Sequence, residues 1–289
     1  MRDHWIYDYS KFGSIVKPII TKSELTMKNI KGFQKLKDEG SSISMVTCYD
    51  YWSAQIVDSS EIDAVLVGDS VAMVMHGYEN TINATVEMMV THTSSVRKGL
   101  KNKFLISDLP FLAHKKGRSK LVDSVDAIFK VGAEAIKIEG ANGALDDIHY
   151  LVSCGIPVMG HLGLTPQSVH KIGGFNVQGQ SKNESEMLIE DAKKLEDSGV
   201  FALVLEMIPA EIAKTITETL SIPTIGIGAG KYTSGQILVL QDLLGLTKSF
   251  NPKFLKKYFD GYSKMQSSLN EYNQEVKNNI FPSDKESYS

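Results

Sequence analysis

Four acidic residues each end a short apolar run of the sequence. The runs are VLVGD, FLISD, IKIE and LVLE, and their last residues are Asp69, Asp108, Glu139 and Glu206. Carboxylates that gather in one place repel one another, so they either surround a cation or bind protons. An oxygen-only ligand set favours Mg²⁺ or Mn²⁺ over zinc. The cluster therefore predicts a divalent-cation site, whereas a single acid after a strand often caps the next helix.

A lysine and a histidine accompany these acids. Lys137 lies two residues before Glu139, so both side chains point to the same face of a strand. A lysine on the inward face of a barrel strand needs a charged partner, either a carboxylate or an anionic substrate. A salt bridge that only closes the barrel is the alternative. His161 ends another apolar run and is as compatible with a structural role as with a catalytic one.

The strands expected to position these residues alternate with amphipathic helical patterns along the chain. The strand candidates are residues 44–49, 64–69, 104–108, 135–139, 157–161, 202–206 and 223–227, with 236–240 a weaker eighth. The helical patterns include residues 86–98, 121–131, 144–153, 184–198 and 210–219. Repeated β–α units predict a parallel sheet, and seven or eight of them favour a closed (β/α)₈ barrel of the α/β class. The strand-end acids are then expected at its C-terminal rim, where barrel active sites are built.

The two ends of the chain differ from this repeating part. We expect residues 1–26 to be an N-terminal extension that is dispensable for folding, because the first clear pattern follows Met27. Residues 27–282 are predicted to be the catalytic barrel domain with C-terminal helices, in which residues 252–277 have a helical composition. Residues 283–289 are a polar tail of disorder-like composition.

Composition narrows the possible partners. The net charge is −3, from 31 basic and 34 acidic residues, which predicts binding to neither nucleic acid nor an anionic membrane. No run approaches the roughly 18 apolar residues of a spanning helix, and the N-terminus lacks the apolar core of a signal peptide. Cys48 and Cys154 are too few for a disulfide framework, and both are expected to be small buried thiols. A cytoplasmic enzyme is the resulting interpretation.

Ten segments, in order, resemble the ketopantoate hydroxymethyltransferase family. They are TCYDYWSA, VLVGDS, THTSSVRKG, SDLPF, KIEG, GHLGLTPQS, GGFNVQG, LVLE, IPTIGIGAG and GQILVLQDLLG. The resemblance covers roughly residues 28–255, and VGDS, KIEG and GHLGLTPQS in series are highly specific. The resemblance implies a (β/α)₈ TIM barrel of the phosphoenolpyruvate/pyruvate type, assembled as a homodecamer of two stacked pentamers.

The resemblance also implies a reaction and a cofactor. A one-carbon unit would pass from 5,10-methylenetetrahydrofolate to 3-methyl-2-oxobutanoate, giving 2-dehydropantoate and tetrahydrofolate in pantothenate biosynthesis. The motifs VGDS, SDLP and KIEG resemble those that supply the family's Mg²⁺ ligands, here Asp69, Asp108 and Glu139.

Substrate and base residues follow from the same motifs. Asp69, Ser70, Asp108 and Lys137 correspond to residues that hold the oxo acid. Glu206 of LVLE corresponds to the general base that removes a proton from the substrate.

Two other readings of the sequence stay open. A Mg²⁺-dependent carbon–carbon lyase on the same barrel would use similar acids, but such enzymes carry a cysteine in a KKCGH-like loop, and this chain has KKGRS at residues 115–119. A non-catalytic scaffold predicts loss of the acids, yet all four are present. If Glu206 is not the base, His161 is the next candidate.

Overall fold

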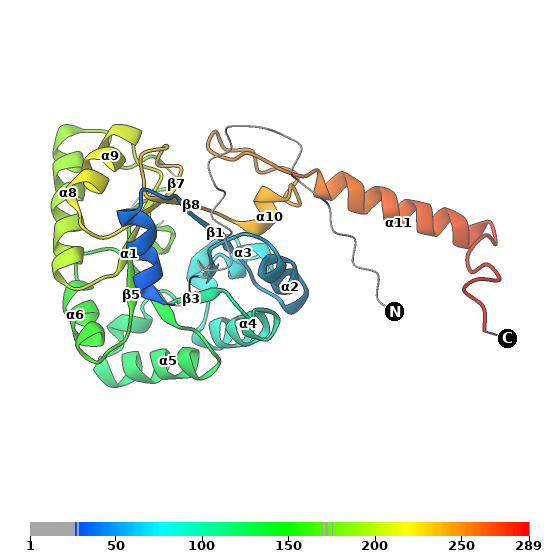
Figure 1. Cartoon of the computed structure of the whole chain (residues 1–289), viewed down its shortest axis with the longest axis horizontal. Helices are drawn as coiled ribbons and strands as arrows, with labels where there is room; N and C mark the ends of the chain where they lie inside the picture. Colours follow the sequence, from blue (N-terminus) through cyan, green and yellow to red (C-terminus); the bar gives the residue numbers. More distant parts are fainter. Residues whose placement is uncertain (1–26, 28, 169, 171–172, 175, 289) are drawn as a thin grey trace, which may run out of the picture.

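The computed structural model describes residues 27, 29–168, 170, 173–174 and 176–288 (Figure 1). Eight parallel strands close into a barrel in the order in which they occur along the chain. The strands are β1 (Ile43–Thr47), β2 (Ala64–Val67), β3 (Phe104–Asp108), β4 (Ala135–Glu139), β5 (Val158–Gly163), β6 (Ala202–Glu206), β7 (Thr224–Ile227) and β8 (Gly235–Leu238). The predicted (β/α)₈ barrel is confirmed, and three predicted strands have the observed bounds.

Helices precede β1, connect most of the strands and follow β8. They are α1 (Ile30–Asp38), α2 (Tyr51–Ser59), α3 (Val71–Val74), α4 (Val86–Gly99), α5 (Arg118–Lys130), α6 (Leu145–Ser153), α8 (Lys182–Asp197), α9 (Ala210–Thr219), α10 (Leu240–Leu243) and α11 (Gly261–Lys277). Short 3₁₀ turns lie at Thr81–Asn83, Ala113–Lys115 and Pro166–Ser168. No helix in the described residues is long and apolar enough to span a membrane.

Two layers of apolar side chains hold the barrel together. The interior layer includes Met45, Ile106 and Val204, which point into the barrel and are buried. Helix α1 closes the bottom of the barrel with Phe33, whose ring packs edge-on against Phe104 at 5.8 Å between centroids. The second layer lies between the strands and the surrounding helices. Because the barrel interior is filled below by these side chains, its C-terminal mouth is the part that can receive a ligand.

Met27, the first residue that the structure describes, belongs to this core. Its side chain is 4% exposed and joins the interior cluster together with α1. A chain that begins at Met27 is therefore expected to fold and to unfold at the same temperature as the full chain. A chain that begins at Ile30 is the control, since loss of a buried methionine costs about 2–5 kcal/mol. Aggregation of the Met27 chain in a thermal scan would assign residues 1–26 to the core.

The chain after β7 departs from the expected pattern. Residues 228–234 join β7 to β8 without a helix, and α10 after β8 has only four residues. The helix predicted over residues 252–277 begins only at Gly261, and residues 252–260 form turns and irregular backbone. Helix α11 then projects away from the barrel (Figure 1).

Candidate active site

The predicted site residues converge at the mouth of the barrel. Asp69, Ser70, Asp108, Lys137, Glu139, His161 and Glu206 all line one cavity of about 110 Å³. The strand register explains this convergence. Asp108 pairs with Lys137 across β3 and β4, and Glu139 pairs with His161 across β4 and β5. Paired residues on parallel strands point to the same face, here the interior of the barrel.

The alternative role of these acids as helix caps is excluded. The N-cap residues of the next helices, α3, α5, α6 and α9, are Ser70, Gly117, Ala144 and Pro209, and none of them makes a side-chain cap hydrogen bond. Helices that are capped use other residues, such as Asp50 for α2 and Thr85 for α4. The four strand-end acids are therefore free to act in the cavity.

Lys137 lies at the centre of the cluster. Its Nζ is 3.1 Å from Asp108 Oδ1, 3.7 Å from Glu139 Oε1 and 3.2 Å from His161 Nδ1. Burial alone would lower the pKa of this lysine, but Asp108 and then Glu139 outweigh burial and raise the pKa above its ordinary value. Lys137 is therefore a buried ammonium ion that offsets part of the negative charge in the cavity.

His161 bridges two of the acids. Its Nδ1 lies 3.3 Å from Glu139 Oε1, and its Nε2 lies 3.3 Å from Glu206 Oε2. Burial and Lys137 both oppose its protonation, yet Glu139 and Glu206 raise the pKa of His161 to about 9. The imidazole is thus a cation at neutral pH and ties the predicted base to the predicted metal ligand.

Asp69 is the acid whose negative charge is least offset by neighbouring groups. Burial, followed by the charges of Asp108 and Glu139, raises its pKa well above the ordinary value for an aspartate. Its backbone N–H donates to Asp108 Oδ2 at 2.9 Å, which fixes the two residues beside each other. A carboxylate in such surroundings gains from a nearby cation or takes up a proton.

Gln167 contacts two of these acids, and sequence reasoning gave it no role. Its Nε2 donates to Asp69 Oδ2 at 2.8 Å, and its backbone N–H donates to Glu139 Oε2 at 3.0 Å. The side chain is buried and also donates to the carbonyl of Leu109. A neutral glutamine carries no charge signal in a sequence, and only its position in the GHLGLTPQS segment could have indicated it.

Tyr49 has a similar role beside Ser70. This tyrosine is fully buried. Its hydroxyl also lies 2.7 Å from Ser70 Oγ. Ser70 is thus oriented at the cavity wall by a side chain from the first strand–helix loop.

The residues of the cavity fit a hard divalent cation by their charge. When Asp69, Asp108, Glu139 and Glu206 are all ionised, Lys137 and His161 offset half of their charge. The excess equals the charge of one divalent ion, and the available donors are oxygens. Among the described residues, no three His, Cys, Asp or Glu side chains are arranged to share one ion directly. Direct coordination by all three predicted ligands therefore stays a prediction.

Solved structures with the same fold define the class of the protein. A phosphonopyruvate hydrolase, solved in complex with oxalate and Mg²⁺, superposes with a TM-score of 0.59 and 9% identity, covering 90% of this chain and 91% of that chain. For 2,3-dimethylmalate lyase, of the phosphoenolpyruvate mutase/isocitrate lyase superfamily, the TM-score is 0.56 at 15% identity, and the coverage is 90% and 91%. At such identities the likeness shows the fold alone. The protein is a closed parallel α/β barrel with a carboxylate-rich site at its mouth.

Sequence comparison specifies the family. A family model for ketopantoate hydroxymethyltransferase matches residues 27–284. A 3-methyl-2-oxobutanoate hydroxymethyltransferase of Bdellovibrio bacteriovorus is 51% identical over 263 residues, covering 91% of this chain and 100% of that protein. The Legionella pneumophila protein of the same name is 53% identical over 260 residues, covering 90% and 99%. The chain therefore belongs to the ketopantoate hydroxymethyltransferase family.

Proposed function

We propose that the protein transfers a hydroxymethyl group from 5,10-methylenetetrahydrofolate to 3-methyl-2-oxobutanoate, giving 2-dehydropantoate and tetrahydrofolate in pantothenate biosynthesis. One water molecule supplies the oxygen of the new hydroxyl group. Family membership supports the reaction. The structural observation that best supports this reaction is a single buried cavity that combines a potential metal site, an ammonium ion and a separate carboxylate.

Asp69, Asp108 and Glu139 would hold Mg²⁺ in this cavity, directly or through water. When bound, such an ion acts as a Lewis acid that withdraws electron density from the keto oxygen of the substrate. Asp69, Ser70, Asp108 and Lys137 would contact the oxo acid. Lys137 supplies a positive charge where the oxo acid carries negative charge, which favours both binding and enolate formation.

Glu206 would remove the proton from C3 of the oxo acid. Its carboxylate is 19% exposed, and it lies farther toward the opening than the almost fully buried Asp108 and Glu139. His161 holds Glu206 through Nε2 and is itself held by Glu139. The histidine would therefore orient the base toward the proton that it removes.

The carbon–carbon lyase reading is less well supported. The two cysteines do not line the cavity: Cys48 is buried behind β1, and Cys154 is exposed at the end of α6. The prediction that both thiols are buried is therefore wrong for Cys154, because the end of α6 faces solvent. Without a cysteine near the cavity, the chain has no counterpart to the expected lyase loop.

Product analysis tests the proposed reaction. The protein is incubated with Mg²⁺, the oxo acid and methylenetetrahydrofolate, and the mixture is followed by NMR. We expect 2-dehydropantoate to appear together with an equal amount of tetrahydrofolate. Cleavage of the oxo acid without use of the folate would favour the lyase instead.

Replacing Gln167 by Met tests the metal part of the proposal. The variant loses the donor to Asp69 but keeps the length of the side chain. Loss of a residue that orients a metal ligand typically costs about 10–100-fold in affinity or activity. Calorimetric titration with Mg²⁺ should show weaker binding of this order. Gln180→Met, on an exposed loop, is the matched control. Unchanged Mg²⁺ affinity of Gln167→Met would place the ion elsewhere.

Cellular context follows from the same family. We propose a cytoplasmic homo-oligomer, a decamer, that acts on small molecules without binding nucleic acid or membranes. The mild net charge of −3 agrees with that proposal.

A further inference from the structure

A second cavity adjoins the active-site cavity at the mouth of the barrel. It has a volume of about 410 Å³ and lies between the loops after β3, β4 and β5 and the first turns of α8. Glu139 and Gln167 line both cavities, so the two cavities share a polar wall. Gly163 also lines the second cavity, and it pairs with Glu206 across β5 and β6. A molecule in the second cavity therefore lies beside the proposed base.

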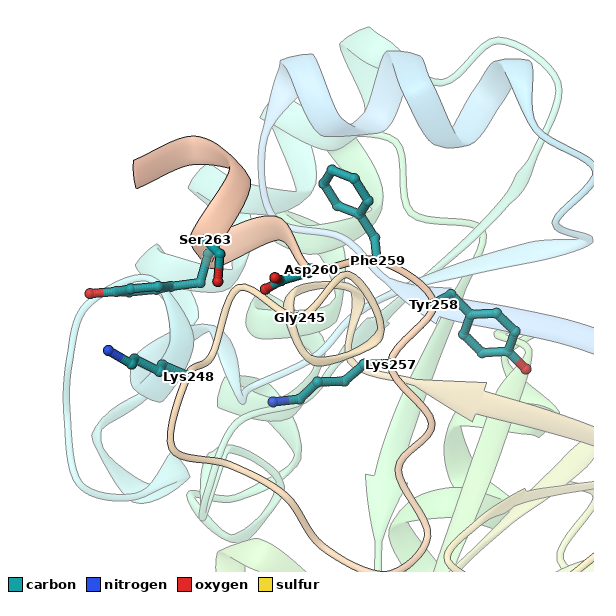
Figure 2. Close-up of a pocket in the computed structure, with 8 residues that line it drawn as sticks. Gly245, Lys248, Lys257, Tyr258, Phe259, Asp260 and Ser263 are labelled. Carbon is teal, nitrogen blue, oxygen red and sulfur yellow. The ribbon is translucent and has the colours of Figure 1, made fainter. Parts of the chain in front are cut away.

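Two other hollows lack this polar connection. The hollow in Figure 2, at the start of α11, shares no described lining residue with the active-site cavity. A groove of about 1230 Å³ along β1 and β8 shares Ile237 and Leu238 with it, and both side chains are apolar. Transfer of a one-carbon unit requires the donor and the acceptor to be in contact. The second cavity is therefore better placed than these hollows to hold the one-carbon donor.

The walls of the second cavity combine apolar surface with hydrogen-bonding groups. Phe111, Leu112, Leu162, Met187 and Leu188 supply the apolar part. Leu112 and Met187 are 46% and 59% exposed, although both are large apolar side chains. The backbone of Leu112 has a φ of 57°, a left-handed conformation that is strained for a leucine and is found mainly at ligand sites. Apolar walls with a few polar groups are typical of a site for a small organic molecule.

Three carboxylates of the described residues line this cavity, and two of them already have fixed partners. Glu139 belongs to the charged cluster of the active site, and Glu184 accepts two backbone hydrogen bonds at the N-terminus of α8. Asp191, farther along α8, is 16% exposed and contacts Lys194 Nζ at 3.5 Å. That lysine lies closer to Glu190, at 2.7 Å. Asp191 is therefore the carboxylate of this cavity that is best able to bind a ligand.

We propose that the second cavity binds the folate co-substrate and that Asp191 binds its pterin ring, an inference that rests on the reaction proposed above. The pyrimidine half of a pterin presents a ring N–H and an amino group side by side, and one carboxylate accepts both hydrogen bonds. The flat ring system packs against the apolar side chains of Leu112 and Met187. The nitrogens that carry the one-carbon unit lie on the opposite side of the pterin from this edge. They therefore face the wall that the two cavities share at Gln167.

Steady-state kinetics of Asp191→Asn tests the assignment of this carboxylate. The amide keeps the size of the side chain but turns one acceptor into a donor that opposes a pterin donor. KM for methylenetetrahydrofolate should rise about 10–100-fold, as expected when hydrogen bonds to a charged group are lost. Exchange of the C3 proton of the oxo acid without folate should not change, because Asp191 does not line the active-site cavity. Glu190→Gln is the matched control, since it removes an exposed carboxylate that pairs with the same Lys194, and its KM should not change.

Anaerobic calorimetric titration of the full chain with tetrahydrofolate separates binding from turnover. The dissociation constant should rise for Asp191→Asn and also for Met187→Glu, which places a charge on the apolar wall. Asn183→Glu adds the same charge on an exposed position of α8 and should leave the constant unchanged.

The outcomes distinguish the folate site from the reaction itself. Unchanged KM and unchanged tetrahydrofolate affinity of Asp191→Asn, in a protein that still forms 2-dehydropantoate, would overturn the assignment of the cavity. A loss of folate-free C3 exchange as large as the loss of turnover would also overturn it, because Asp191 would then act on the oxo acid or on the fold. Absence of product from the unchanged protein would instead overturn the proposed reaction.

Discussion

Replacing Glu206 by Gln is expected to slow exchange of the C3 proton of 3-methyl-2-oxobutanoate by on the order of 10²–10⁴-fold, the usual contribution of a positioned base. Glutamine keeps the shape of the side chain and can still contact His161 Nε2, but it cannot accept the proton. Binding of Mg²⁺ and of the oxo acid should stay nearly intact, because the residues proposed to hold them are unchanged.

The control for this variant is Glu211→Gln, which removes an exposed carboxylate at the start of α9. Its exchange rate should equal that of the unchanged protein. An equal loss of metal binding in Glu206→Gln would make Glu206 a ligand. Unchanged exchange would assign the base to another residue, with His161 next.

Replacing Lys137 by Met is expected to have the largest effect on stability. The variant leaves Asp108 and Glu139 without their buried ammonium partner. Breaking a buried ion pair in this way costs about 3–5 kcal/mol. Affinity for the oxo acid should also fall, because the cavity loses the positive charge that offsets the substrate's own. Denaturant unfolding and calorimetric titration measure the two effects.

The pH dependence of the Lys137→Met variant follows from the acids that remain. Asp69 and Asp108 already have pKa values above the ordinary range, mainly because they are buried. Without Lys137 these pKa values rise further. A carboxyl whose pKa is higher in the folded than in the unfolded state stabilises the folded protein while it is protonated. This contribution is lost as pH rises through the folded-state pKa. The variant's deficit in the free energy of unfolding should therefore shrink as pH falls and grow as pH rises.

Lys130→Met is the matched control, because Lys130 pairs with Asp126 on the exposed face of α5. Such a surface pair contributes about 0–1 kcal/mol. A stability loss for Lys137→Met no greater than that of the control would show that the ammonium ion is not needed to hold the acids together.

The fold and the charged part of the site could be predicted because both depend on local patterns. A short apolar run that ends in an acid identifies both a strand and its C-terminal end. Because the strands are parallel, these ends lie together at the barrel rim, which brings Asp108, Glu139 and Glu206 into one cavity. Two-residue periodicity alone predicts that Lys137 and Glu139 lie on the same face of one strand, as observed.

The remaining features depend on contacts between distant parts of the chain. Gln167 and Tyr49 are neutral, and their roles depend on hydrogen bonds to Asp69 and Ser70, far away in sequence. The late start of α11 has a similar origin, because backbone bonds from residues 258–262 to residues 243–245 compete with helix formation before Gly261. Local composition contains no sign of either kind of contact.

The central claim is that this cavity activates C3 of the oxo acid through a metal site and a separate base. Exchange of the C3 proton, measured with the oxo acid but without folate, tests this claim most directly. The full chain is incubated in D₂O with 3-methyl-2-oxobutanoate, with and without Mg²⁺, in the absence of folate, and deuterium at C3 is followed by NMR. We predict exchange that requires both the protein and Mg²⁺ and that is restored when Mg²⁺ is added back after chelation. Exchange at the same rate in the presence of a chelator, or no exchange above the protein-free rate with Mg²⁺, would contradict the account.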